Sequence, residues 1–117
     1  MHGLRRPFAR FQGPGIIEIV PKKTYGKNKR SCRVTFELPA DVQAQSASLV
    51  GDFNDWSQES HPMTRRKDGR LSVTVSLNTE QSYRYRFLLD GSRWENDWAA
   101  DTYVTNSYGT EDSLVQV

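Results

Sequence analysis

Three segments of the chain alternate between apolar and polar residues at every second position. In residues 32–38, 71–77 and 83–89, the first, third, fifth and seventh residues of each segment are apolar or aromatic, and most of the residues between them are polar. A half-buried β-strand requires a period of two, whereas a helix repeats every 3.6 residues. No segment shows sustained apolar spacing at three and four residues. The alternation therefore predicts an all-β protein. The outward residues include Arg33, Thr35, Glu37, Arg84, Arg86 and Leu88.

Turn residues separate these segments and predict antiparallel pairing. Pro39 ends the first segment, KDGR at 67–70 is a turn, and Asp90-Gly91 is a strong hairpin signal. Residues 47–53 and 113–117 add two short strands, and residues 16–20 either form an edge strand or pack on the surface. Short strands at regular spacing indicate an antiparallel β-sandwich. Because Cys32 is the only cysteine, an internal disulfide is excluded, and an antibody-type domain with it.

The charges are distributed unevenly along the 117 residues, which suit one domain. Residues 1–30 carry eight Lys or Arg and one acid, a net charge of +7, whereas residues 31–117 carry eight basic and thirteen acidic residues, a net charge of −5. We predict a basic, flexible arm over 1–30, with a linker-like stretch at 22–30, before a folded domain over 31–117. The arm is either solvated or touches nucleic acid, a membrane surface or an acidic partner, and we favour a solvated arm. We expect no membrane partner, because no apolar run is long enough to cross a bilayer.

Residues for catalysis or metal binding are scarce. The only histidines, His2 and His61, lie far apart and away from any acidic cluster, so we expect no metal site and a solvated His61. No nucleophile motif or glycine-rich phosphate loop occurs. Asp52 and Asp55 flank a turn, where Asp side chains commonly accept hydrogen bonds from their own backbone. We therefore expect no enzyme and no cofactor.

Aromatic residues near loops are the remaining chemical signal. Trp56 follows GDFND, Trp94 follows the Asp90-Gly91 turn, and Tyr108 lies in a later loop. Sugar rings present apolar C–H faces that stack on indole, and their hydroxyls need polar partners at the rim. The structural alternative is that each tryptophan caps an end of the sandwich. Trp98 either extends the aromatic surface or lies in the core, and we favour the core.

Three blocks of sequence resemble a known family. GDFNDW (51–56), YRFLLDGSRW (85–94) and TNSYGTEDSLVQV (105–117) are similar to the glycogen-binding domain of the AMP-activated protein kinase β subunit, a member of carbohydrate-binding module family 48. The resemblance covers roughly residues 32–117 and implies an early-set, immunoglobulin-like β-sandwich. Residues 20–38 and ENDWAAD also look like small stand-alone bacterial early-set proteins without a catalytic barrel, which implies a cytoplasmic location.

The resemblance also implies a glucan site. Trp56 and Trp94 would stack on sugar rings, Phe53 would anchor the turn in the core, and Asn54 would brace the loop backbone. Three matched positions depart from the kinase domain: Arg86 stands where that domain has Lys, Tyr108 where it has Leu, and Asp112 where it has Asn. The implied carbohydrate-binding residues are Trp56, Arg86, Trp94, Tyr108, Thr110 and Asp112.

The function that follows is non-catalytic binding of an α-1,4-glucan such as glycogen, starch or a maltooligosaccharide. A glycogen-metabolising enzyme is a second candidate partner. One alternative is a protein-interaction module that has lost sugar binding, for which the changes at Tyr108 and Asp112 leave room. The other is a nucleic-acid binder that uses the basic arm, an interaction expected to weaken strongly with salt. We favour glucan over nucleic acid.

Overall fold

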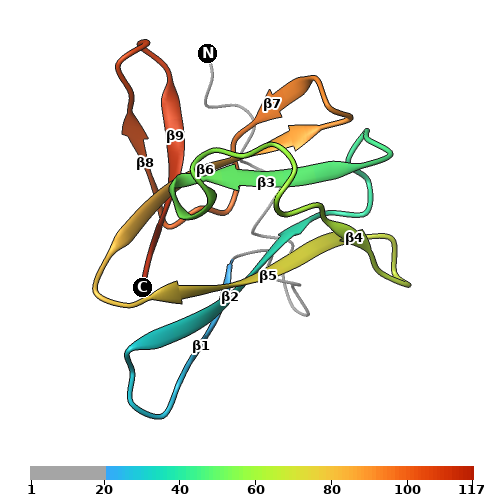
Figure 1. Cartoon of the computed structure of the whole chain (residues 1–117). Helices are drawn as coiled ribbons and strands as arrows, with labels where there is room; N and C mark the ends of the chain where they lie inside the picture. The colour runs from blue at the N-terminus through green and yellow to red at the C-terminus, as the bar shows by residue number, and fades with distance from the viewer. Residues whose placement is uncertain (1–20) are drawn as a thin grey trace, which may run out of the picture.

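Two antiparallel sheets face each other in the computed structural model, which describes residues 21–117 (Figure 1). The four-stranded sheet has the order β1 (Lys22–Tyr25), β2 (Ser31–Leu38), β5 (Leu71–Asn78), β4 (Thr64–Arg65). The five-stranded sheet has the order β3 (Ala47–Gly51), β6 (Ser82–Leu89), β9 (Glu111–Gln116), β8 (Thr102–Thr105), and β7 (Arg93–Glu95) also pairs with β6. A 3₁₀ turn, η3 (Asp52–Asn54), follows β3. The predicted immunoglobulin-like sandwich is confirmed.

The core lies between the sheets and consists of the inward positions of the alternating segments. Phe36 on β2 and Tyr85 on β6 are fully buried, and their ring centroids lie 4.8 Å apart in an edge-to-face contact. Cys32 is buried and free. Full burial of a side chain as large as that of Phe36 stabilises the fold by roughly 1.5–3 kcal/mol.

One buried polar group connects this core to a loop. The hydroxyl of Tyr85 donates to Asp97 Oδ2 at 2.6 Å. Burial, and then the negative charge of Asp97, raises the pKa of Tyr85 well above its ordinary value. The hydroxyl therefore stays protonated in the folded protein and ties the segment after β7 to the sheet.

Glu37 departs from the alternation. It lies on the outward face of β2, yet its side chain is buried. The guanidinium groups of Arg66 and Arg70 donate to its two oxygens at 3.0 and 3.1 Å. The prediction of an exposed Glu37 is wrong because both arginines come from the β4–β5 turn and fold over that face of the sheet.

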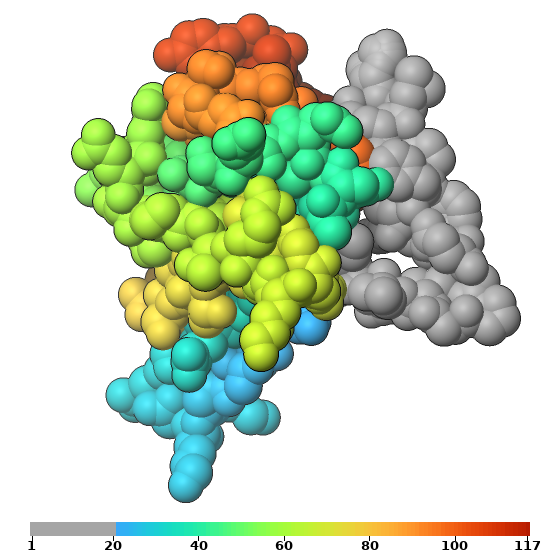
Figure 2. All heavy atoms as spheres, turned by 90° about the vertical axis from the view of Figure 1, so that its right-hand side faces the viewer, coloured from blue at the N-terminus to red at the C-terminus, as the bar shows by residue number. Residues whose placement is uncertain are grey.

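The linker-like stretch expected at 22–30 is also wrong in part. Residues 22–25 form β1, which pairs with β2 from Lys22↔Thr35 to Tyr25↔Cys32, and the hairpin between them projects from one end of the molecule (Figures 1 and 2). Lys23 Nζ reaches Asp101 at 2.7 Å. The strand expected at 16–20, and the basic arm over 1–20, lie outside the described residues. No helix within residues 21–117 is long and apolar enough to span a bilayer.

Candidate functional site

The turn after β3 places Trp56 at the surface. The Trp56 N–H donates to the carbonyl of Gly51 at 2.9 Å and closes the turn. Asp55 and Trp56 both adopt left-handed backbone conformations, with φ of 54° and 58°. This conformation is unfavourable for a bulky L-residue. Gly51 is required because a Cβ there would lie only 2.4 Å from the backbone oxygen of Arg84.

Asn54 holds the turn together, as predicted. Its Oδ1 accepts from the Gly51 N–H at 3.1 Å, and its Nδ2 donates to the Leu49 carbonyl at 3.0 Å. Its amide also lies 2.8 Å from His61 Nδ1, so the expectation of a solvated His61 is wrong. Phe53 is half-buried and packs against the core, which confirms its anchoring role.

The expectation that the Asp52 side chain bonds the backbone of its own turn is wrong. The Asp52 Oδ1 accepts from the Trp56 indole Nε1 at 2.9 Å. Its Oδ2 accepts from the backbone N–H of Arg84 on β6 at 2.8 Å. The pairing of β3 with β6 ends at Gly51↔Tyr85, so the carboxylate supplies the acceptor that the next backbone carbonyl would have supplied. Asp52 therefore connects the tryptophan to the sheet.

The β6–β7 hairpin positions Trp94. Asp90 and Gly91, with φ of 52° and 72°, are the central residues of a turn that the Ser92 N–H closes by donating to the Leu89 carbonyl at 3.0 Å. The register pairs Leu88 with Trp94, so the indole lies on the same outer face as Arg86. Leu88, expected among the outward residues, is on that face but is buried, because β7 brings Trp94 beside it.

Asp90 also fastens this hairpin to the loop before β3. Its Oδ1 accepts from the N–H groups of Gln45 and Ser46 at 2.9 and 3.0 Å. The backbone N–H of Ser46, and then that of Gln45, lower the pKa of the Asp90 carboxyl. The turn that precedes Trp94 is thus held at two points.

Arg86 lies where the pairing of β6 changes from β9 to β7. Its guanidinium is bonded to β9 and to the residue just before that strand. Nε donates to Asp112 Oδ1 at 2.9 Å, and Nη2 donates to Thr110 Oγ1 at 3.0 Å and to the carbonyl of Glu111 at 2.6 Å. Asp112 is buried, and its Oδ2 also lies 3.5 Å from Arg84 Nη1. These side chains and the Glu111 carbonyl therefore form a polar surface whose groups are bonded to one another, called the polar floor below.

Asn106 is a member of this floor that the sequence analysis missed. Its Oδ1 accepts from the N–H groups of Tyr108 and Thr110 at 2.9 and 3.1 Å, and its Nδ2 donates to Asp112 Oδ1 at 3.1 Å. An Asn that precedes a short loop ending in Gly109, whose φ is 84°, is a recognisable turn signal. Asn106 shapes the β8–β9 loop that carries Tyr108.

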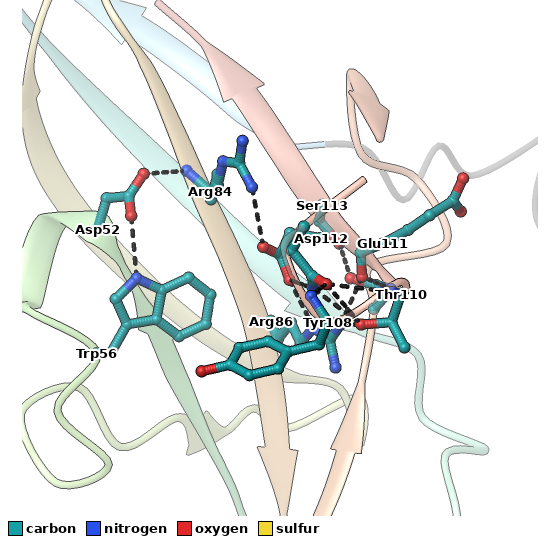
Figure 3. A network of polar contacts seen from close by, with 11 residues as sticks. Asp52, Trp56, Arg84, Arg86, Tyr108, Thr110, Glu111, Asp112 and Ser113 are labelled. Carbon is teal, nitrogen blue, oxygen red and sulfur yellow. Dashed lines mark hydrogen bonds and ion pairs between the residues drawn. The ribbon is translucent and has the colours of Figure 1, made fainter. Parts of the chain in front are cut away.

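These elements line an open hollow of about 490 Å³ on the outer face of the five-stranded sheet. It is lined by all six predicted site residues and by three others, Asp52, Arg84 and Asn106. In the view of Figure 3, the ring of Tyr108 extends from the polar contacts around Asp112 and Thr110 toward the indole of Trp56. Two arginines and two aspartates line the hollow, so their charges balance.

Exposed aromatic surface is concentrated here. The large apolar side chains exposed in the described part of the chain are Tyr25 (47%), Trp56 (36%), Trp94 (39%) and Tyr108 (89%), and three of these line the hollow. Trp98 does not line it, and Trp98 is only partly buried rather than a full core residue. Residues 21–117 contain no group of three His, Cys, Asp or Glu side chains placed to hold a metal ion.

The sequence is similar to known proteins over the same region. The sequence profile of the carbohydrate-binding module 48 family (isoamylase N-terminal domain) matches residues 24–104. A 1,4-alpha-glucan branching enzyme of Aquifex aeolicus is 33% identical over 66 residues, which cover 56% of this chain and 10% of that protein. Branching enzymes of Deinococcus radiodurans and Novosphingobium aromaticivorans are 36% and 40% identical over 62 and 47 residues, 53% and 38% of this chain. The matches span a tenth or less of each relative's length.

Proposed function

Because the chain belongs to the carbohydrate-binding module 48 family, we propose that the hollow binds an α-1,4-glucan, such as glycogen, starch or a maltooligosaccharide, without catalysing a reaction. The observation that carries this proposal is the grouping of three exposed aromatic side chains, Trp56, Trp94 and Tyr108, around one polar floor. Exposed indole surface is costly in water, and a sugar face covers it while leaving hydroxyls at the rim.

The polar floor divides into residues that contact the sugar and residues that support them. Arg86 Nε and Nη2 are occupied by protein oxygens, whereas Nη1 donates no hydrogen bond within residues 21–117. We assign Nη1 to a glucan hydroxyl. The carboxylate of Asp112 is buried, and the Thr110 hydroxyl already donates to Asn106 Oδ1 at 3.1 Å, so both residues act mainly by holding Arg86 and the loop in place.

The balanced charge of the lining favours a neutral ligand. The aspartate carboxylates offset the two arginines, so no net positive charge remains to attract phosphate or another anion. An unmodified glucan, which is neutral and rich in hydroxyls, suits this lining better than nucleic acid does. The branching-enzyme relatives are consistent with an α-glucan as the ligand.

Isothermal titration calorimetry with maltoheptaose and with glycogen tests the proposal. We expect saturable binding by the full chain, and we expect Trp56→Ala and Trp94→Ala each to weaken it by about 1–3 kcal/mol, as central aromatic anchors do. Tyr25→Ala is the matched control, because Tyr25 is an exposed aromatic residue outside the hollow. It should leave the affinity unchanged.

Failure to bind either glucan, by wild-type protein shown to be folded, would refute the proposal. The chain would then fit the alternative of a protein-docking module. The observation that favours this alternative is that Asp112 and Thr110 are already bonded within the protein.

A further inference from the structure

We propose that Asp52 is a positioning residue of the glucan site, which holds the Trp56 indole in the orientation that stacks on sugar. The inference rests on the proposed function, because an indole oriented to stack on sugar presupposes that the hollow binds glucan. The contacts that support it belong to the structure alone.

The backbone of Trp56 needs such support. Two consecutive residues, Asp55 and Trp56, are left-handed, and the second carries the largest of all side chains. Strained conformations of this kind persist only where surrounding interactions impose them, and they cluster at functional sites. Within the turn, the backbone bond from Trp56 N–H to the Gly51 carbonyl fixes the main chain but leaves the side-chain torsions free.

Asp52 restrains those torsions. Its Oδ1 accepts from the indole Nε1 at 2.9 Å while its Oδ2 is held by the Arg84 N–H at 2.8 Å (Figure 3). The second bond anchors the carboxylate to β6, which is the strand that also carries Arg86. The aromatic wall and the arginine of the floor are therefore connected through one carboxylate and one strand.

This arrangement determines how Trp56 recognises a ligand. Because its only polar hydrogen is already bonded to Asp52, the indole has no free donor for a sugar hydroxyl. Trp56 can contribute only the face and edge of its ring. Its contribution to affinity should therefore depend on the ring's orientation, which Asp52 controls.

The indole N–H signal of Trp56 in a ¹H–¹⁵N NMR spectrum, assigned from its loss in Trp56→Phe, reads the positioning without any ligand. We expect the signal to shift, and its exchange with solvent to accelerate, in Asp52→Ala. Asp52→Asn keeps one acceptor oxygen and should give an intermediate change. Asp55→Asn is the matched control, since it removes a carboxylate from the same turn, and it should leave the signal in place.

A double-mutant cycle with maltoheptaose reads the consequence for binding. Asp52→Ala should weaken binding roughly tenfold in the wild-type background, the expected loss for a hydrogen bond to a charged group. In the Trp56→Phe background the same change should cost less than twofold, because phenylalanine has no N–H for Asp52 to hold. The two backgrounds share any general effect of Asp52 on folding.

The possible outcomes separate the two proposals. An unchanged indole signal in Asp52→Ala, or an equal loss of affinity in both backgrounds, would overturn the positioning role while glucan binding by the wild type stands. A shifted indole signal in a protein that binds no glucan would uphold the restraint on the ring and refute the proposed function.

Discussion

Replacing Trp56 with glycine should give a more stable protein than replacing it with alanine, although glycine is the poorer residue at most positions. The reason is the φ of 58° at Trp56. Alanine keeps the Cβ that makes this conformation cost about 1–2 kcal/mol, and glycine removes it. Glycine gives back about 0.4–1 kcal/mol through the greater freedom of its unfolded chain. Both variants lose the indole and its bond to Asp52, so those losses cancel.

The net advantage of glycine is about 0.5–1 kcal/mol, which for a domain of this size corresponds to a melting temperature roughly 2–4 °C higher than that of Trp56→Ala. Thermal unfolding of the two variants by circular dichroism measures the difference. Both should bind maltoheptaose equally weakly, because each lacks the ring. The two substitutions at Trp56 would then differ in stability but not in their affinity for maltoheptaose.

Trp94 provides the control. Its exposure, 39%, is close to the 36% of Trp56, but it lies in the extended strand β7, where its backbone is unstrained. Glycine in a strand is worse than alanine by about 0.5–1 kcal/mol. The order of stability should therefore reverse, with Trp94→Ala above Trp94→Gly. The same order at both tryptophans would refute the argument that the Trp56 backbone is strained.

Three further predictions follow from the core and the floor of the site. Tyr85→Phe removes the hydrogen bond to Asp97 and should lower the free energy of unfolding by about 1–3 kcal/mol. Because the folded pKa of Tyr85 is raised, its contribution is complete below the unfolded pKa of about 10 and is lost as the pH rises from there toward the folded pKa. Urea titrations at pH 9 and 11 should therefore show a smaller decline in the free energy of unfolding of Tyr85→Phe than of the wild type. Gly51→Ala should destabilise the protein by about 1–3 kcal/mol or more, measured by urea unfolding, since the added carbon would lie 2.4 Å from a backbone oxygen of β6. Asp112→Ala leaves Arg86 without its carboxylate, and we expect weaker binding of maltoheptaose in calorimetry together with a stability loss of about 1–3 kcal/mol, whereas an unchanged affinity would contradict the positioning of Arg86 by this floor.

Much of the fold could be predicted because its code is local. The strands β2, β5 and β6 follow a period of two in which one buried face needs apolar residues, and the Asp90-Gly91 turn needs two left-handed residues. The short strands β1, β4 and β7 had no such pattern. Each is ordered by pairing with the longer strand next to it in the sequence, β1 with β2, β4 with β5 and β7 with β6, so its own composition carries little information.

The sequence by itself determined the β-sandwich, the aromatic residues at the loops, and the six residues that line the hollow with others. It did not determine their roles. The sequence predicts that the Asp52 side chain bonds its own turn and that Glu37 faces solvent. In the structure, Asp52 connects the Trp56 indole to β6, and Glu37 is covered by two arginines. Hydrogen-bonding groups carry no sequence signal for a partner far along the chain. Only the packing of the strands brings such a partner within reach, and only then is it clear which polar groups are already bonded and which remain for a ligand.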